Sequence, residues 1–230
     1  MTRPVDVNVT TEDVGAGDLN PSETAGIKAT ALRLERVGDL AGAKAIWQQL
    51  SDHGNLDAKF HLGLLSERKK AFSEAAVHYS KAAAEGHLLS MFALGLLHEA
   101  DNDFEMAIEW WKRAAEGGHP ESVLKLGHLL DVLGRRSEAL LFYRRAAEQF
   151  GDAEAMNNLG LLHRESERRE LAEDWWRRAA GAGNAEAMNN LGVLCRELGD
   201  TKGARQWWQR ASSLGSSAAQ RNLDRMDREP

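Results

Sequence analysis

The residues of this sequence best suited to binding a metal or moving a proton are its eight histidines. His87 and His119 stand 32 residues apart, and His98 and His163 share a second recurring position. No two histidines are spaced i, i+4, and neither a His-Glu-x-x-His motif nor a cysteine-rich cluster occurs. We therefore predict structural or surface roles for the histidines, and no metal site.

Nucleophilic and phosphate-binding chemistry finds equally little support. The single Cys195 follows an apolar stretch, which favours an inert buried thiol over a nucleophile. There is no glycine-rich phosphate loop and no Gly-x-Ser-x-Gly elbow, and adjacent carboxylates such as Glu173 and Asp174 point to different faces of a helix. We predict a non-enzymatic protein without a cofactor. An enzymatic alternative would need a pocket joining three titratable residues. These are His128, His163 and Asp131.

The seven tryptophans fall into two adjacent columns of a repeating pattern. They could form a stacking platform for bases or sugars, or they could fill the space between neighbouring helices. Because Tyr79, Tyr143 and Phe142 share these columns, we favour packing. The first column holds Trp47, Trp111, Trp176 and Trp208, and the second holds Trp110, Trp175 and Trp207.

An internal repeat organises all of these residues. Five Leu-Gly pairs place glycines 32, 32, 33 and 32 residues apart, with an alanine twelve and an aromatic sixteen residues after each. A fixed period of this length predicts a stacked solenoid of helix pairs. We expect each glycine to face the alanine, so that two helices can approach closely. The glycines are Gly63, Gly95, Gly127, Gly160 and Gly192.

Each repeat reads as helix, turn, helix and a glycine-containing link. Asn20-Pro21-Ser22-Glu23 predicts the first helix start, Asp152 and Asn184 can cap later helices, and the one extra residue lies in the link around Phe150. A polar last helix over residues 216–227 suits a terminal cap. The predicted repeats span residues 20–54, 55–86, 87–118, 119–151, 152–183 and 184–215.

The N-terminal residues, the net charge and the cysteine count indicate which partners and which location to expect. Residues 1–19 are polar and acidic, so we expect a disordered tail, or a short strand or docking segment over Val5-Asp6-Val7-Asn8-Val9. The net charge of −6 argues against a nucleic-acid-binding groove. A lone cysteine and the lack of a bilayer-spanning apolar run or secretory signal indicate a cytoplasmic protein without a membrane partner.

These columns resemble the tetratricopeptide repeat family, and within it the Sel1-like branch. The resemblance is carried by Ala107-Ile108-Glu109-Trp110-Trp111-Lys112-Arg113-Ala114-Ala115-Glu116-Gly117 followed by Leu126-Gly127, and it covers residues 20–227. It implies an all-α, right-handed α-solenoid of six helix-turn-helix repeats plus a C-terminal capping helix. It also implies an adaptor that binds a partner peptide or protein segment along its concave face.

Two rows of the repeat are expected to line that face. Four residues after the repeat glycine the charge changes sign along the chain, and asparagine stands two residues before it where family members hold a ligand's backbone. We predict a C-terminal half that grips an acidic segment or C-terminal carboxylate, and an acidic half that faces basic residues of the same partner. The predicted site residues are Lys125, His128, Asn157, Asn158, Arg164, Asn189, Asn190, Arg196, Glu67, Glu99 and Asp131.

Two alternatives remain open for this surface. The next row runs in the opposite order of charge, from Arg36 and Arg68 to Glu165 and Glu197, so ion pairs between repeats could occupy both rows. The paired asparagines could also come from a recent duplication. A homodimeric assembly scaffold is the alternative function, with apolar residues of the concave face at its interface. These are Leu64, Leu96, Leu161 and Val193.

Overall fold

The computed structural model describes residues 20–228, and the predictions for the tail over residues 1–19 lie outside them. The described residues form thirteen helices and no strand, which confirms the all-α fold of six helix pairs and a last capping helix. The helices are α1 (Pro21–Val37), α2 (Leu40–Asp52), α3 (Leu56–Arg68), α4 (Phe72–Ala84), α5 (Leu88–Ala100), α6 (Phe104–Glu116), α7 (Pro120–Val132), α8 (Arg136–Phe150), α9 (Ala153–Glu165), α10 (Arg169–Gly181), α11 (Ala185–Glu197), α12 (Thr201–Ser213) and α13 (Ser217–Arg228).

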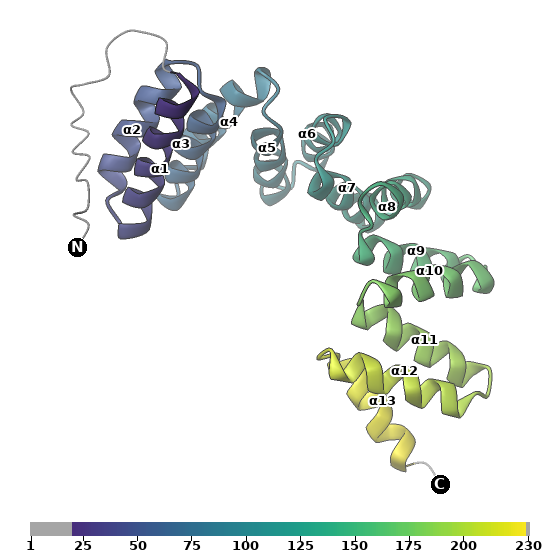
Figure 1. Ribbon diagram of the computed structural model, residues 1–230. Coiled ribbons are helices and arrows are strands. Elements are labelled where there is room, and N and C mark those ends of the chain that lie inside the picture. The colour runs from purple at the N-terminus through teal and green to yellow at the C-terminus, as the bar shows by residue number, and fades with distance from the viewer. Residues whose placement is uncertain (1–19, 229–230) are drawn as a thin grey trace, which may run out of the picture. The chain divides into compact units, whose positions relative to one another are not determined.

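The chain divides into two compact units, Met1–Trp110 and Trp111–Pro230, with the boundary inside α6. We call them unit 1 and unit 2. In unit 1, helices α1 to α5 each pack against the next in sequence (Figure 1). In unit 2, helices α7 to α13 do the same, and α11 also contacts α9 and α13. The prediction that residues 20–227 make a single domain stays a prediction.

The helix ends follow the sequence signals. Asn20 accepts a hydrogen bond from the backbone N–H of Glu23, whose side chain accepts one from the backbone N–H of Asn20, so the predicted capping box is confirmed. Asp152 and Asn184 cap α9 and α11 as predicted. The expected link around Phe150 is wrong, because Phe150 is the last residue of α8 and the extra residue lengthens that helix.

The expected glycine–alanine contact is also wrong, because Gly63, Gly127, Gly160 and Gly192 face aromatic rings. A Cβ added to Gly127 would lie 2.6 Å from Tyr143 Cδ1, and one added to Gly63 would overlap the Tyr79 ring. The alanines of the twelfth position are buried as well, but the large ring four residues later is what reaches the glycine. The rings of Tyr79, Tyr143, Trp176 and Trp208 therefore pack on the bare glycine backbone of the first helix in their own helix pairs.

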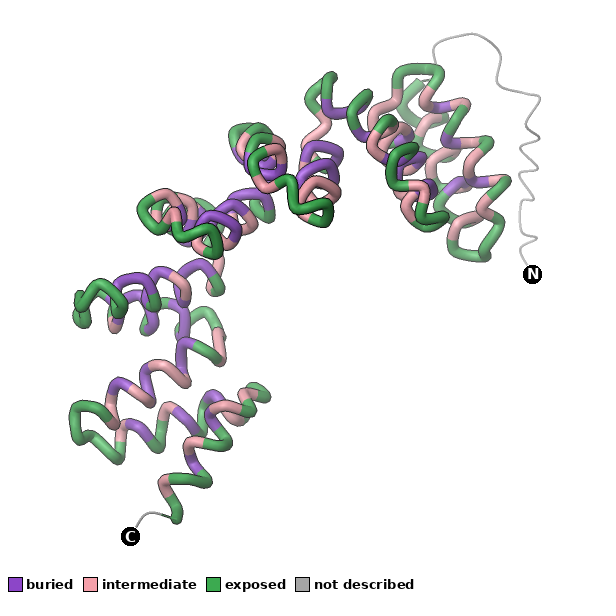
Figure 2. Tube along the Cα trace, turned by 180° about the vertical axis from the view of Figure 1, so that it is seen from behind, coloured by how far each residue is buried: buried purple, intermediate pink, exposed green. Residues whose placement is uncertain are grey.

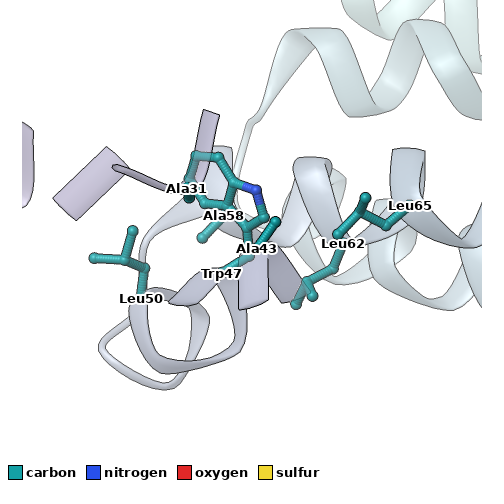
Figure 3. Close-up of a cluster of buried hydrophobic side chains, with 7 residues drawn as sticks. All are labelled: Ala31, Ala43, Trp47, Leu50, Ala58, Leu62 and Leu65. Atoms are coloured by element: carbon teal, nitrogen blue, oxygen red, sulfur yellow. The ribbon is translucent and has the colours of Figure 1, made fainter. Parts of the chain in front are cut away.

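In each unit, buried residues recur from helix to helix along the stack (Figure 2). In unit 1, Trp47 is buried in a cluster with Ala31, Ala43, Ala58 and Leu62 (Figure 3). Since Trp47, Trp111, Trp176 and Trp208 are each at most 1% exposed, the packing interpretation of this column is confirmed.

Among residues 20–228, no helix is both long and apolar enough to cross a membrane.

Candidate functional site

The candidate site lies within unit 2, where three first helices, α7, α9 and α11, present two neighbouring rows of side chains. Positions i and i+3 share a helix face, so each helix contributes two neighbouring residues. We call this surface the first-helix face and define it by six side chains that are at least partly exposed. They are Lys125, His128, Asn158, Leu161, Asn190 and Val193.

Asparagines connect successive first helices by side-chain hydrogen bonds. Asn190 Nδ2 on α11 donates to Asn157 Oδ1 on α9 at 3.0 Å. Asn222 Nδ2 on α13 makes the equivalent bond to Asn189 Oδ1 at 2.8 Å. Asn157 is 7% exposed, so the row formed by Asn157, Asn158 and Asn190, which we call the amide row, is partly structural.

The amide row ends at a histidine on α7. Asn157 Nδ2 lies 3.4 Å from Asn158 Oδ1, and Asn158 Nδ2 lies 2.9 Å from His128 Nε2. His128 Nε2 also lies 3.2 Å from a carboxylate oxygen of Glu154, and its ring meets the edge of Tyr143. Three first helices are thus joined by one chain of polar contacts.

The position four residues after the repeat glycine changes from acidic residues to arginine along the chain, and the hydrogen bonds of the indole N–H groups change with it. In unit 1, Trp47 Nε1 donates to the carboxylate of Glu35 at 2.6 Å. Arginine cannot accept such a bond, and in unit 2 the indoles donate to backbone carbonyls at 3.2 Å, Trp176 to Asn157 and Trp208 to Asn189.

The predicted cations of the site are already in contact with protein groups. Arg164 Nη2 lies 2.5 Å from Glu197 Oε1, and Arg136 pairs with Glu165 at 3.0 Å. Of these two, the Arg164–Glu197 pair joins the two rows of opposite charge, whereas Arg136 lies outside both rows. Lys125 lies over the Trp111 ring, with Nζ 5.7 Å from its centroid, and Arg196 is half-buried.

The three predicted acidic residues are divided between the two units. Asp131 belongs to unit 2, where burial raises the pKa of its carboxyl and the Glu165 charge adds to the rise. Glu67 and Glu99 are half-buried side chains of unit 1. Burial raises the pKa of Glu67, and the Tyr79 hydroxyl opposes that shift.

The remaining titratable residues singled out in the sequence lie elsewhere. His163 is buried on α9, and its pKa is lowered by burial and by the Arg168 and Arg144 charges. Burial raises the pKa of the half-buried Cys195 thiol, which disfavours the reactive thiolate. No group of three metal-ligating side chains is found within residues 20–228.

Sequence reasoning missed Glu154. It stands one helical turn before Asn158, so it shares that face of α9, and the spacing i, i+4 was the available signal. That spacing gave no indication that Glu154 approaches a histidine of another helix.

Comparison with known families agrees with this architecture. The Sel1 repeat model matches residues 58–87 and 88–119. Two tetratricopeptide repeat models match residues 124–185 and 184–214. The chain belongs to the tetratricopeptide/Sel1-like repeat family. Proteins of this family are generally protein-interaction adaptors and are typically non-enzymatic.

Solved structures of tetratricopeptide/Sel1-like proteins share the fold, while no curated protein sequence matches the chain. A Sel1 repeat protein from Oxalobacter formigenes is 24% identical, with a TM-score of 0.65 over 85% of this chain and 91% of that one. PilF of Pseudomonas aeruginosa is 15% identical, with a TM-score of 0.66 over 87% and 96%. YrrB, described as a tetratricopeptide repeat protein with an unusual peptide-binding site, is 17% identical, with a TM-score of 0.57 over 77% and 97%.

Proposed function

We propose that this protein is a non-enzymatic adaptor that holds an extended segment of a partner protein on the first-helix face of unit 2. The observation that carries the proposal is the amide row, which runs across α7, α9 and α11. An asparagine side chain offers both donors and acceptors, as the backbone of an extended peptide does. Bonds within the row use only part of this capacity, and they hold the side chains in place before a ligand arrives.

Side chains beside the amide row would select the ligand. Leu161, which is 37% exposed, and Val193 offer apolar contacts one turn from the asparagines. Lys125, Arg164 and Arg196 favour acidic side chains or a C-terminal carboxylate through charge-assisted hydrogen bonds. An incoming carboxylate at Arg164 would have to replace Glu197. The basic residues of the same partner would face the acidic side chains Glu67, Glu99 and Asp131.

The experiment begins with affinity capture and crosslinking to obtain a partner segment, followed by titration of that segment. Asn158→Ala/Asn190→Ala should weaken binding at least tenfold, since two hydrogen bonds are worth about 2 kcal/mol. Asn222→Ala is the matched control, because it removes the same kind of inter-helix bond outside the first-helix face. Unchanged affinity in the double variant, or equal losses in variant and control, would contradict the proposal.

The alternative proposal is a homodimeric scaffold with apolar residues at its interface, and the exposure of Leu161 is the observation in its favour. Light scattering at micromolar concentration separates the two. A monomer disfavours the scaffold, whereas a dimer that Leu161→Asp dissociates would favour the scaffold over the adaptor proposal.

We also propose a cytoplasmic location, with neither nucleic acid nor membrane as partner, from the single cysteine and the acidic charge.

A further inference from the structure

His128 occupies a position in which one nitrogen faces two groups of opposite kind. Nε2 lies 2.9 Å from the amide nitrogen of Asn158, which is a donor, and 3.2 Å from a carboxylate oxygen of Glu154, which is an acceptor. A ring nitrogen either accepts through its lone pair or donates its proton. Only one of the two contacts is therefore favourable at a time.

The surroundings of His128 contain both charges. Glu154 approaches from α9, and Tyr143 approaches from α8 with its ring 5.6 Å away at 63° and its hydroxyl hydrogen-bonded to the Asn158 side chain. On its own helix, Asp131 and Lys125 stand three residues to either side, and His128 is among the charges that lower the pKa of Asp131. The His128 side chain is 34% exposed, so a proton can reach it from solvent.

The amide row gives the Asn158 contact a direction. Asn190 donates to Asn157, Asn157 points its amide nitrogen at Asn158 Oδ1, and Asn158 points its amide nitrogen at His128. This order needs a lone pair on Nε2, which the neutral ring with its proton on Nδ1 supplies. A protonated ring has no lone pair, repels the Asn158 amide hydrogens and donates to Glu154 instead.

We propose that His128 is a pH-dependent positioning residue for the amide row. In its neutral form with the proton on Nδ1 it fixes Asn158 with the oxygen toward Asn157. In its protonated form it pairs with Glu154 and releases Asn158, which reverses or withdraws its amide. The consequence for ligand binding rests on the proposed function: protonation removes a preformed part of the first-helix face and weakens the hold on the segment.

The amide switch can be tested in the free, full-length protein by NMR of the asparagine side-chain amides between about pH 5 and 8, the range in which histidine changes charge. The Asn158 resonances should shift together with the His128 ring resonances. The Asn189–Asn222 pair, which has no histidine neighbour in its hydrogen bonds, should stay fixed. Asn158 resonances that do not follow the His128 ring would overturn the inference.

Two variants sharpen this test. His128→Gln keeps an acceptor oxygen at every pH, so its Asn158 resonances should no longer titrate, while His53→Gln at an exposed position should behave as the parent. A transition that persists in His128→Gln would contradict the mechanism.

A binding measurement then tests the functional consequence with a labelled extended peptide that carries two glutamates and a free C-terminal carboxylate. Between about pH 7.5 and 5.5 the parent should lose about fivefold in affinity and His128→Gln much less, as expected for one hydrogen bond. Equal losses in both would overturn this consequence. If the peptide does not bind at all, the proposed function is at fault, whereas the NMR result concerns the switch alone.

Discussion

The repeat glycines give room for the aromatic rings of the second helices. At Gly160, an added Cβ would overlap the indole of Trp176, whose Nε1 donates to the Asn157 carbonyl. The sequence showed that glycine and aromatic recur together, but an alanine column recurs at an equally constant interval. Spacing alone could not show whether the alanine or the aromatic side chain reaches the glycine. The size of the ring and the direction in which its side chain leaves the helix decide it.

Gly160→Ala should therefore lower the free energy of unfolding by roughly 3 kcal/mol, the upper part of the range for overpacked cores, because the buried ring has no space to move into. Urea unfolding measures this change. Gly26→Ala is the matched control, since Gly26 lies in α1 with no atom within 4 Å of an added Cβ. It should stabilise by about 0.5–1 kcal/mol. A neutral Gly160→Ala would contradict the glycine–ring contact.

At the scale of the helix, two N-caps are histidines. His87 and His119 each direct Nδ1 at the backbone N–H three residues on, at 3.3 Å, and at the hydroxyl of the same serine. The caps at Asp152 and Asn184 could be predicted because those residue types cap helices commonly. The histidine caps could not, since the role depends on which ring nitrogen carries the proton.

The His119 cap makes stability depend on pH. Burial lowers the pKa of His119 and Glu121 partly opposes this, so the folded state binds the proton less well than the unfolded state. The cap's contribution is complete above the ordinary histidine pKa of about 6.5 and is lost as pH falls through the lower, folded-state value. His119→Asn should retain about 1 kcal/mol more of the unfolding free energy at low pH than the parent does.

Urea unfolding at neutral and acidic pH measures the effect. Part of the pH dependence should remain in His119→Asn, because burial also lowers the pKa of His61, His78 and His163. Asn184→His is the reciprocal variant, and it should increase the pH dependence by a similar amount. An identical pH profile for parent and both variants would show that the imidazole cap does not contribute.

At the scale of the whole molecule, helices α1 to α5 and helices α7 to α13 each pack against the next in sequence, so the stability of each unit should be a sum of repeat and interface terms. The helix α13 illustrates the interface term. It packs on α12, buries Ala219 and Leu223, and ties Asn222 to Asn189 of α11.

A chain ending after Gly215 should lose hydrogen-exchange protection in α11 and α12, while α1 and α2 keep theirs. The reason is that the stabilising contacts of α13 are confined to its neighbours. Loss of protection spread evenly from α1 to α12 would indicate a single cooperative unit instead of a stack. Arg221→Ala, at an exposed position of α13 whose hydrogen bond to Ser217 stays within that helix, serves as the control and should leave protection unchanged.

The fold could be predicted from the sequence because it is repeated six times, and the site could be predicted only in outline. The asparagine rows were visible, but the bond from Asn190 to Asn157 and the approach of Glu154 to His128 depend on how one helix pair is set against the next. The same packing determines that Arg164 meets Glu197. Such contacts are absent from any single repeat, so spacing within a repeat could not indicate them.

The most direct test of the adaptor proposal places a photo-crosslinking amino acid at Leu161 on the first-helix face, or at Leu141 on the second helix α8. Leu141 is 62% exposed and Leu161 only 37%, so non-specific capture would favour position 141. We predict that the partner segment crosslinks from position 161 and not from position 141. Crosslinks from position 141 alone, or equally from both, would contradict binding on the first-helix face.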